Sequence, residues 1–150
     1  MNGQIKIDGM LSFSGGTTSY SGRCAFMTTG DVNINASLLS CNNGAAANYA
    51  NSYPVSNCIG IMSKTNINMG TGSGASQLDI MGALYAQGTI TSAKQTNLLG
   101  TIVSSNFNIT KNVPNVYQVP ELANNLPQGM IGSNPIMVLK MVSWRELGLG

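Results

Sequence analysis

The chain contains no histidine and very little charge of either sign. Only 8% of its residues are Asp, Glu, Lys or Arg, whereas soluble domains average about 25%. Without histidine there is no Ser-His-Asp triad, no imidazole general base and no zinc ligand of the commonest type. Hydrolysis through such a triad is excluded, and we predict that the chain is not an enzyme and needs no cofactor.

Long apolar runs and clusters of basic residues are also missing. No stretch approaches the roughly 20 apolar residues of a membrane span, and the segment after Met1 lacks the charged and then apolar pattern of an export signal. The net charge of +2 comes from scattered residues, which do not form the basic stripe that nucleic-acid binding needs. We expect no nucleic-acid partner, no membrane segment in this chain, and an export or anchoring segment upstream of it.

Gly, Asn, Ser and Thr are abundant instead, with 18 glycines among 150 residues. Glycine reaches positive φ freely, and asparagine tolerates it while bonding to its own backbone, so both residue types favour turns. No window has the Glu, Lys and Ala content of a surface helix. A chain of this length is one domain of ordinary size, and its composition predicts many short strands joined by many corners.

Short units with apolar residues two apart recur along the chain. Residues 5–7 and 11–13 place apolar side chains at alternate positions on either side of Asp8-Gly9, as half-buried strands do. Similar units stand at 30–35, 64–70 and 77–82. Two short strands that meet at a corner are therefore the predicted repeating unit.

The best internal match relates residues 82–88 to residues 100–106, a displacement of 18 residues. Residues 89–91 then correspond to 107–110 after one extra residue. A displacement near 18 suits a coil of three short strands, because six residues a side is the spacing of hexapeptide repeats.

These repeats predict an all-β fold, a single-domain right-handed parallel β-helix of short strands. Stacked coils would pair each strand with its equivalent one turn away, about 4.8 Å distant, and align the inward residues in ladders. The alternative is an antiparallel sandwich or barrel. Its hairpin signals are weak, because Asn43-Gly44 leads into alanines rather than into a strand.

The predicted coils cover residues 1–112, with loops extruded near 42–57 and 70–76. Prolines follow, and because proline cannot donate to a ladder, we expect the coil to end near Thr110. Residues 113–150 are predicted to close the C-terminal end of the same domain, since an open end exposes unpaired backbone groups. This cap is expected to contain Pro114, Pro120, Pro127 and Trp144, with residues 136–144 as the final strand.

Three cysteines, Cys24, Cys41 and Cys58, fall at equal intervals of 17 residues. Because this interval is close to one coil, they are predicted to stack on successive coils as a ladder. The spacing of about 4.8 Å between coils lies within the roughly 4.4–6.8 Å Cα range of disulfides, so one adjacent pair could be oxidised in an exported protein. Three small buried free thiols are an equal alternative.

The five acidic residues are candidates for chemistry only if two or more converge. A glycan-cleaving β-helix would need a pair of them, and calcium would need six or more oxygen ligands. Nothing else in the sequence converges on them, so we interpret them as solvent-facing strand residues and predict no catalytic or metal site. They are Asp8, Asp31, Asp79, Glu121 and Glu146.

The five tyrosines are candidates for a sugar-binding groove, because aromatic faces stack on sugar rings. Their scattered spacing favours ordinary packing instead. They are Tyr20, Tyr49, Tyr53, Tyr85 and Tyr117.

Several stretches of the second half carry a family resemblance. They are Gly-Ala-Leu-Tyr-Ala-Gln-Gly at 82–88, Lys-Gln-Thr-Asn at 94–97, Gly-Thr-Ile-Val at 100–103, and the tail segments 116–122, 125–130 and 143–147. With these stretches, residues 78–147 resemble the C-terminal β-rich region of PilX-like type IV pilus assembly proteins. In such proteins an apolar pilin-like helix precedes the β-rich part, and this sequence contains none. The resemblance brings no catalytic residues. A weaker, architectural similarity is to bactofilins, polymer-forming cytoskeletal β-helices.

Together these observations predict a non-enzymatic structural or assembly module of a bacterial cell-surface or pilus-associated protein. The expected location is extracellular or periplasmic, and the expected partners are other subunits of the assembly, with self-association among them. The alternative function is a carbohydrate-binding or carbohydrate-cleaving β-helix domain.

Overall fold

The structure is a computed structural model that describes residues 1–40, 52–73, 77–109 and 112–130. Strands dominate the described residues, and the one helix among them, α1 (Leu122–Asn125), has four residues. The strands are β1 (Gly3–Ile7), β2 (Leu11–Phe13), β3 (Thr17–Tyr20), β4 (Arg23–Thr28), β5 (Val32–Ile34), β6 (Ser37–Ser40), β7 (Cys58–Ser63), β8 (Ile67–Met69), β9 (Gln77–Ser92), β10 (Gln95–Ile109) and β11 (Asn115–Gln118).

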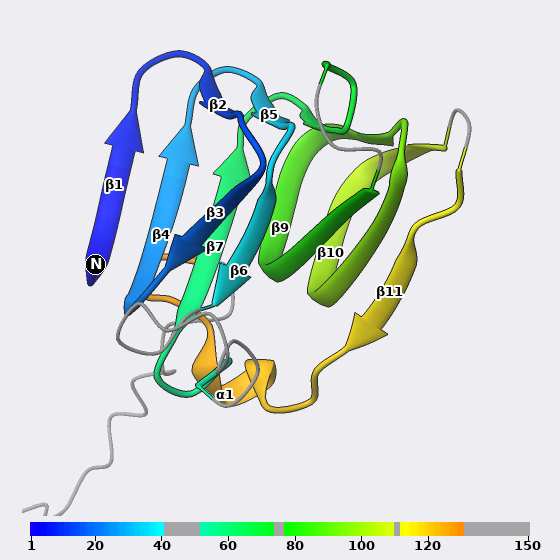
Figure 1. The fold of residues 1–150 in the computed structure, drawn as a ribbon. Coiled ribbons are helices and arrows are strands. Elements are labelled where there is room, and N and C mark those ends of the chain that lie inside the picture. Colours follow the sequence, from blue (N-terminus) through cyan, green and yellow to red (C-terminus); the bar gives the residue numbers. More distant parts are fainter. Residues whose placement is uncertain (41–51, 74–76, 110–111, 131–150) are drawn as a thin grey trace, which may run out of the picture.

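The strands wind into a three-sided parallel solenoid of about five coils (Figure 1). The first side contains β1, β4 and β7, followed by the middle parts of β9 and β10. The second side contains β2, β5, β8 and the last parts of β9 and β10. The third side contains β3, β6, the first parts of β9 and β10, and β11. The predicted all-β parallel β-helix is therefore confirmed.

Apolar side chains stack inside the coils as ladders that run along the axis. One ladder on the first side joins Ile61 to Leu84, and one on the second side joins Ile67 to Ile90. These four side chains are almost completely buried. The ladders form because alternate residues point inward and each strand pairs in parallel with its equivalent one coil away.

The 18-residue repeat is confirmed, with one correction. Residues 82–86 pair in register with residues 100–104, as the internal match predicts. Beyond that point Thr89 pairs with Asn106, so the extra residue lies in the earlier coil, where β9 carries a bulge relative to β10. The unit at 77–82 is also not equivalent to 30–35 and 64–70, because β9 begins on the third side while β5 and β8 stack on the second.

Corners between the sides depend on glycine and on side-chain hydrogen bonds. Gly22, between β3 and β4, has φ +89°, and a Cβ there would lie 2.1 Å from the carbonyl oxygen of Met1. Another corner is held by Asp31, whose Oδ1 accepts hydrogen bonds from Thr65 Oγ1 at 2.5 Å and from Asn66 N at 3.1 Å. On the third side Asn97 donates to Asp79 at 2.8 Å. Only glycine fits the first position, whereas the side-chain bonds tie neighbouring coils together.

The predicted end of the coil is wrong. The ladder does not stop near Thr110 or at residue 112, because β11 pairs in parallel with β10 from Asn115 to Gln118. Pro114 directly precedes this strand, where its missing donor costs nothing to the ladder. The C-terminal boundary of the solenoid is therefore six residues or more beyond the predicted one.

The cap prediction requires residues 119–130 to cross the C-terminal end of the solenoid, but they do not. They return along its outside: Leu122 packs near Met81 and Tyr53, and Met130 reaches Ala25 on β4. Figure 1 shows this segment, with α1, passing beneath the sheet toward β4. Pro120 and Pro127 belong to this return segment, whereas Trp144 and the predicted final strand 136–144 lie outside the described residues.

Candidate functional site

The fifth coil leaves large apolar side chains uncovered. We call residues 101–109 and 115–118 the open coil. Its apolar side chains have the following exposed fractions: Val103 51%, Phe107 54%, Ile109 49%, Val116 45% and Tyr117 56%. Ile90 and Leu98, which precede Phe107 and Val116 in the ladders, are at most 1% exposed.

Several of these exposed side chains occupy positions that are part of the core in every inner coil. Phe107 is in register with Ile90, and Val116 with Leu98. They are exposed because no further strand pairs with the outer edge of the open coil among the described residues. The first coil is also uncovered on its outer edge, where Ile5 is 38% exposed. Both ends of the described solenoid therefore present apolar interior and strand edge.

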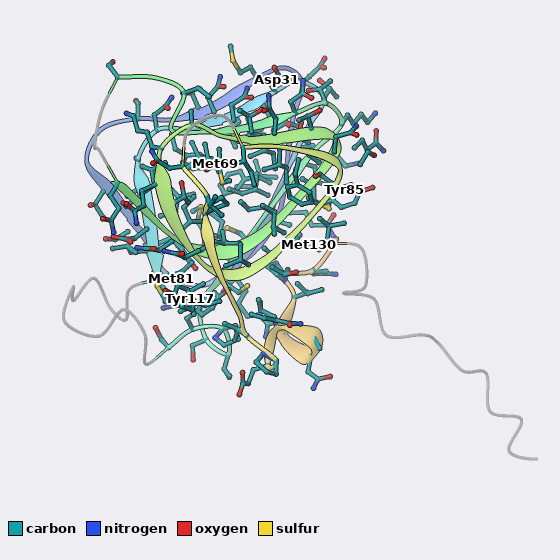
Figure 2. All side chains as sticks on the ribbon, turned by 90° about the vertical axis from the view of Figure 1, so that its right-hand side faces the viewer. Asp31, Met69, Met81, Tyr85, Tyr117 and Met130 are labelled. Atoms are coloured by element: carbon teal, nitrogen blue, oxygen red, sulfur yellow. The ribbon has the colours of Figure 1, made fainter. Side chains whose placement is uncertain are left out.

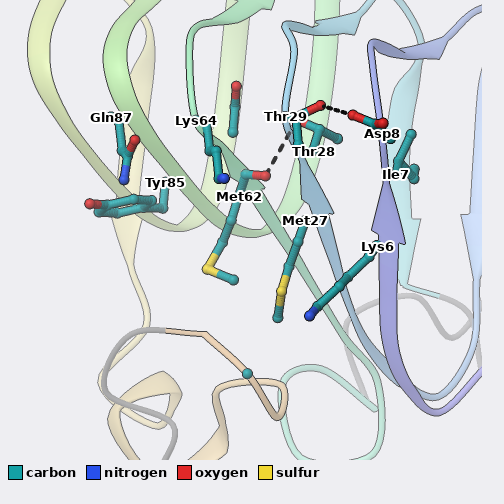
Figure 3. Close-up of a pocket in the computed structure, with 12 residues that line it drawn as sticks. Lys6, Ile7, Asp8, Met27, Thr28, Thr29, Met62, Lys64, Tyr85 and Gln87 are labelled. Atoms are coloured by element: carbon teal, nitrogen blue, oxygen red, sulfur yellow. Dashed lines mark hydrogen bonds between the residues drawn. The ribbon is translucent and has the colours of Figure 1, made fainter.

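A second candidate site is a groove of about 500 Å³ on the outer face of the first side. Its floor is one row of outward side chains on four neighbouring strands, Lys6, Met27, Met62 and Tyr85, which are in register. Figure 3 shows Tyr85 and Lys6 at opposite ends, with the two methionines between them. We call it the side groove.

One wall of the side groove is the return segment. The row of side chains next to the floor is small, Ala25, Gly60 and Ala83, and Met130 packs on it. A Cβ on Gly60 would lie 2.2 Å from Met130 Sδ, so the close approach of the segment depends on these small residues. In Figure 2, which looks along the axis, Tyr85 and Met130 lie on the outside of the same side, whereas Met69 is in the interior.

The opposite wall of the side groove is polar. It contains Lys64, Gln87 and the corner residues Asp8 and Thr29. Thr29 Oγ1 donates to Asp8 Oδ1 at 2.8 Å, so one oxygen of this carboxylate already accepts a hydrogen bond. Lys6 and Lys64 are exposed, and their ammonium groups make no ion pair or hydrogen bond with another described residue. The groove thus combines an apolar and aromatic floor with two available cations.

The predicted cysteine ladder does not form between Cys24 and Cys58. β4 and β7 are neighbouring strands, so no coil separates the two residues, and Cys24 pairs with Ile59 instead. Because they are one residue out of register, their side chains face opposite sides of the sheet. Cys24 joins the interior cluster and Cys58 an outer cluster. Both thiols are free and buried, and Cys41 lies outside the described residues.

Burial dominates the acid-base properties of the groups near these thiols. It raises the pKa of Cys58 to about 12 and also raises the pKa of Cys24. The pKa values of Tyr20 and Tyr53 are likewise raised by burial. Tyr20 donates its hydroxyl to the Met81 carbonyl at 2.7 Å. These properties describe packed core residues rather than a reactive nucleophile.

The acidic residues do not converge. Asp8 and Asp31 lie at the same corner of neighbouring coils, between β1 and β2 and between β4 and β5, but each carboxylate accepts from a different threonine. Asp79 lies on the third side of the solenoid. The hydrogen bond from Thr65 is the largest contribution that lowers the pKa of Asp31. The Asp31 carboxylate therefore has a structural role. Among the described residues, no three His, Cys, Asp or Glu side chains are grouped to hold a metal ion. Glu121 precedes α1, and Glu146 lies outside the described residues.

The tyrosines do not line one common groove. Tyr20 and Tyr53 are buried, Tyr117 is on the open coil, and Tyr49 lies outside the described residues. Tyr85 alone lines the side groove. Sequence reasoning missed the other members of its row because Met27 and Met62 are 35 residues apart, well beyond the 18-residue repeat.

The fold defines the chain as a β-solenoid protein. Comparison with known proteins finds no family model, no curated protein and no solved structure that matches it. No helix among the described residues has the length and apolar character that a membrane crossing requires.

Proposed function

We propose that this chain is a non-enzymatic structural module whose open coil docks on another β-solenoid end, with the first coil of a second copy as the partner. The observation that carries the proposal is the exposure of core positions, such as Phe107 at 54%. Contiguous exposed apolar surface of this kind marks interaction sites. A strand edge without a partner also pairs readily with another strand.

The two ends of the described solenoid are complementary in shape and hydrogen bonding. Each inner coil is covered by another parallel coil with the same three-sided outline, and the first coil of a second copy offers that outline again. In this arrangement Leu11 would stack on Phe107 and Ile5 on Ile102, which continues the ladders of the single chain. The described residues of the open coil carry no ionisable group except the Tyr117 phenol, so this end brings no charged side chain into the junction to be desolvated.

A polar ladder on the third side ends at the same edge. Asn97 donates to Asp79, and Asn115 donates to Asn97 at 2.9 Å. Asn115 is on the open coil. The equivalent residue of the first coil is Thr17, whose hydroxyl can both donate and accept. A second copy could therefore extend this ladder by one more step.

The proposed setting is the bacterial cell surface or a pilus-associated assembly. Its support is the resemblance of residues 78–147 to PilX-like proteins and the low charge of the chain. In that setting a rigid solenoid with docking ends would join or space neighbouring subunits. The proposal assigns no catalytic role to the acidic residues, since each described aspartate is hydrogen-bonded within its own neighbourhood.

Sedimentation velocity over a range of micromolar to millimolar concentrations tests this function. We expect the wild-type chain to form dimers and longer oligomers as its concentration rises. Phe107→Lys places a charge on the open coil and should leave the chain monomeric. Because Phe107 is already half exposed, this variant should keep the strand-rich circular dichroism spectrum of the wild type.

Val55→Lys is the matched control. Val55 is 60% exposed but lies in the turn before β7, so its replacement should leave the association unchanged. A wild-type chain that stays monomeric over the whole range would reject a second copy as the partner. Equal association of the wild type and Phe107→Lys would reject the open coil as the interface.

A further inference from the structure

The side groove is built by residues that the structural function does not use. Its floor row crosses β1, β4, β7 and β9, which are three steps of about 4.8 Å between neighbouring strands. At about 500 Å³ it is within the range of roughly 300–1,000 Å³ that is typical of small-molecule sites. We propose that the side groove binds an acidic glycan, with Tyr85 under a sugar ring and Lys6 and Lys64 on its carboxylates.

The preference for an anion follows from the charges around the groove. Lys6 lies on β1 and Lys64 directly after β7, and neither ammonium group is neutralised by another described residue. The one carboxylate in the lining, Asp8, is engaged by Thr29. Two free ammonium groups and one hydrogen-bonded carboxylate leave the groove with a net positive charge. An anionic ligand would gain Coulombic attraction from both ammonium groups, which a neutral ligand would not.

The preference for a sugar follows from the chemistry of the floor and the wall. Aromatic rings and methionine thioethers pack on the apolar faces of rings, and Tyr85, Met62 and Met27 supply both. Gln87 offers an amide with donors and an acceptor for hydroxyl groups. Together they provide the few polar groups above an apolar surface that ligand sites generally show.

An extended peptide fits the side groove less well. Peptides that add to a sheet gain affinity from main-chain hydrogen bonds at an exposed strand edge. The floor here is the face of the sheet, and the backbones of β4 and β7 are already paired on both edges. A glycan needs no such partners, because it is recognised by side chains alone.

Isothermal titration calorimetry with a galacturonate oligosaccharide tests the proposal, and its methyl ester serves as the uncharged control ligand. We expect the acid form to bind and the methyl ester to bind at least tenfold more weakly. Lys6→Gln and Lys64→Gln should each weaken binding by up to about fivefold, as exposed charge pairs do. Tyr85→Ala should weaken it by about tenfold.

Tyr117→Ala and Lys94→Gln are matched controls, since they remove the same side-chain types outside the groove and should leave affinity unchanged. Equal binding of acid and ester, loss of binding in the control variants, or absence of binding would each overturn the proposal. So would tighter binding of an oligoglutamate peptide. Phe107→Lys, which is monomeric if the open coil is the interface, should bind the glycan like the wild type, so the two proposals fail separately.

Discussion

At the scale of one residue, the buried thiol of Cys58 makes the stability of the solenoid depend on pH. Its side chain is fully buried, and burial raises the pKa of the thiol from 9.0 to about 12. Below pH 9 the thiol is protonated in both the folded and the unfolded chain. Between pH 9 and 12 the unfolded chain loses this proton and the folded chain keeps it, so the free energy of unfolding falls as pH rises.

We therefore predict that replacing Cys58 makes the protein less sensitive to alkali. In urea unfolding between pH 8.5 and 10, Cys58→Ala should lose stability more slowly than the wild type, by up to roughly 1 kcal/mol per pH unit. The buried tyrosines, with pKa values also raised, contribute at higher pH in both proteins. Parallel curves for the two proteins would show that burial does not raise the pKa of Cys58 in the folded state.

The return segment 119–130 is the element that departs most from the sequence prediction. It lies along the outside of the solenoid, and its Leu122 is buried, with 3% exposure. Leu126 contacts the same two outer clusters, and its carbonyl accepts a hydrogen bond from Arg23 at 3.1 Å. The segment therefore links the fifth coil to the second, and its packing should contribute to stability.

Leu122→Ala tests that contribution. We expect it to lower the free energy of unfolding by roughly 2–4 kcal/mol, because it removes a buried side chain and leaves a cavity. Val113→Ala is the control, since Val113 is 72% exposed and its replacement should change stability by less than about 0.5 kcal/mol. A loss for Leu122→Ala as small as that of the control would mean that the segment is not docked in solution.

Elements with strong local signals could be predicted from the sequence. The alternation at 5–7 and 11–13 gave β1 and β2, and the 18-residue displacement gave the register of β9 and β10. The stacking of β4 on β7 could not be found in this way, because an insertion separates partners such as Met27 and Met62 by 35 residues. The side groove depends on that pairing, so most of it was hidden from sequence reasoning.

Prolines misled the prediction of where the solenoid ends. Pro114 was interpreted as the start of a cap, yet it stands one residue before β11 and takes no part in the ladder. Pro120 and Pro127 lie where the chain leaves the coils. A proline excludes a central strand position but not the residue before a strand, so it cannot distinguish a corner from an end.

At the scale of the whole molecule, the described residues form a short rod whose two ends are uncovered by any of them, with a groove along one side. Its interior ladders run from the first coil to the fifth without a capping element among the described residues. This architecture connects the proposed docking function with the low charge of the sequence, because the described residues of the open coil carry no charged side chain. The side groove would remain accessible along such a rod.

Hydrogen exchange at several protein concentrations tests the docking of the two ends most directly. If copies stack, the amides of β1 and of residues 101–109 pair across the junction, and their exchange should slow as concentration rises. Amides of β7, which is paired on both edges, should exchange at the same rate throughout. Exchange at both ends that does not change with concentration would contradict the account.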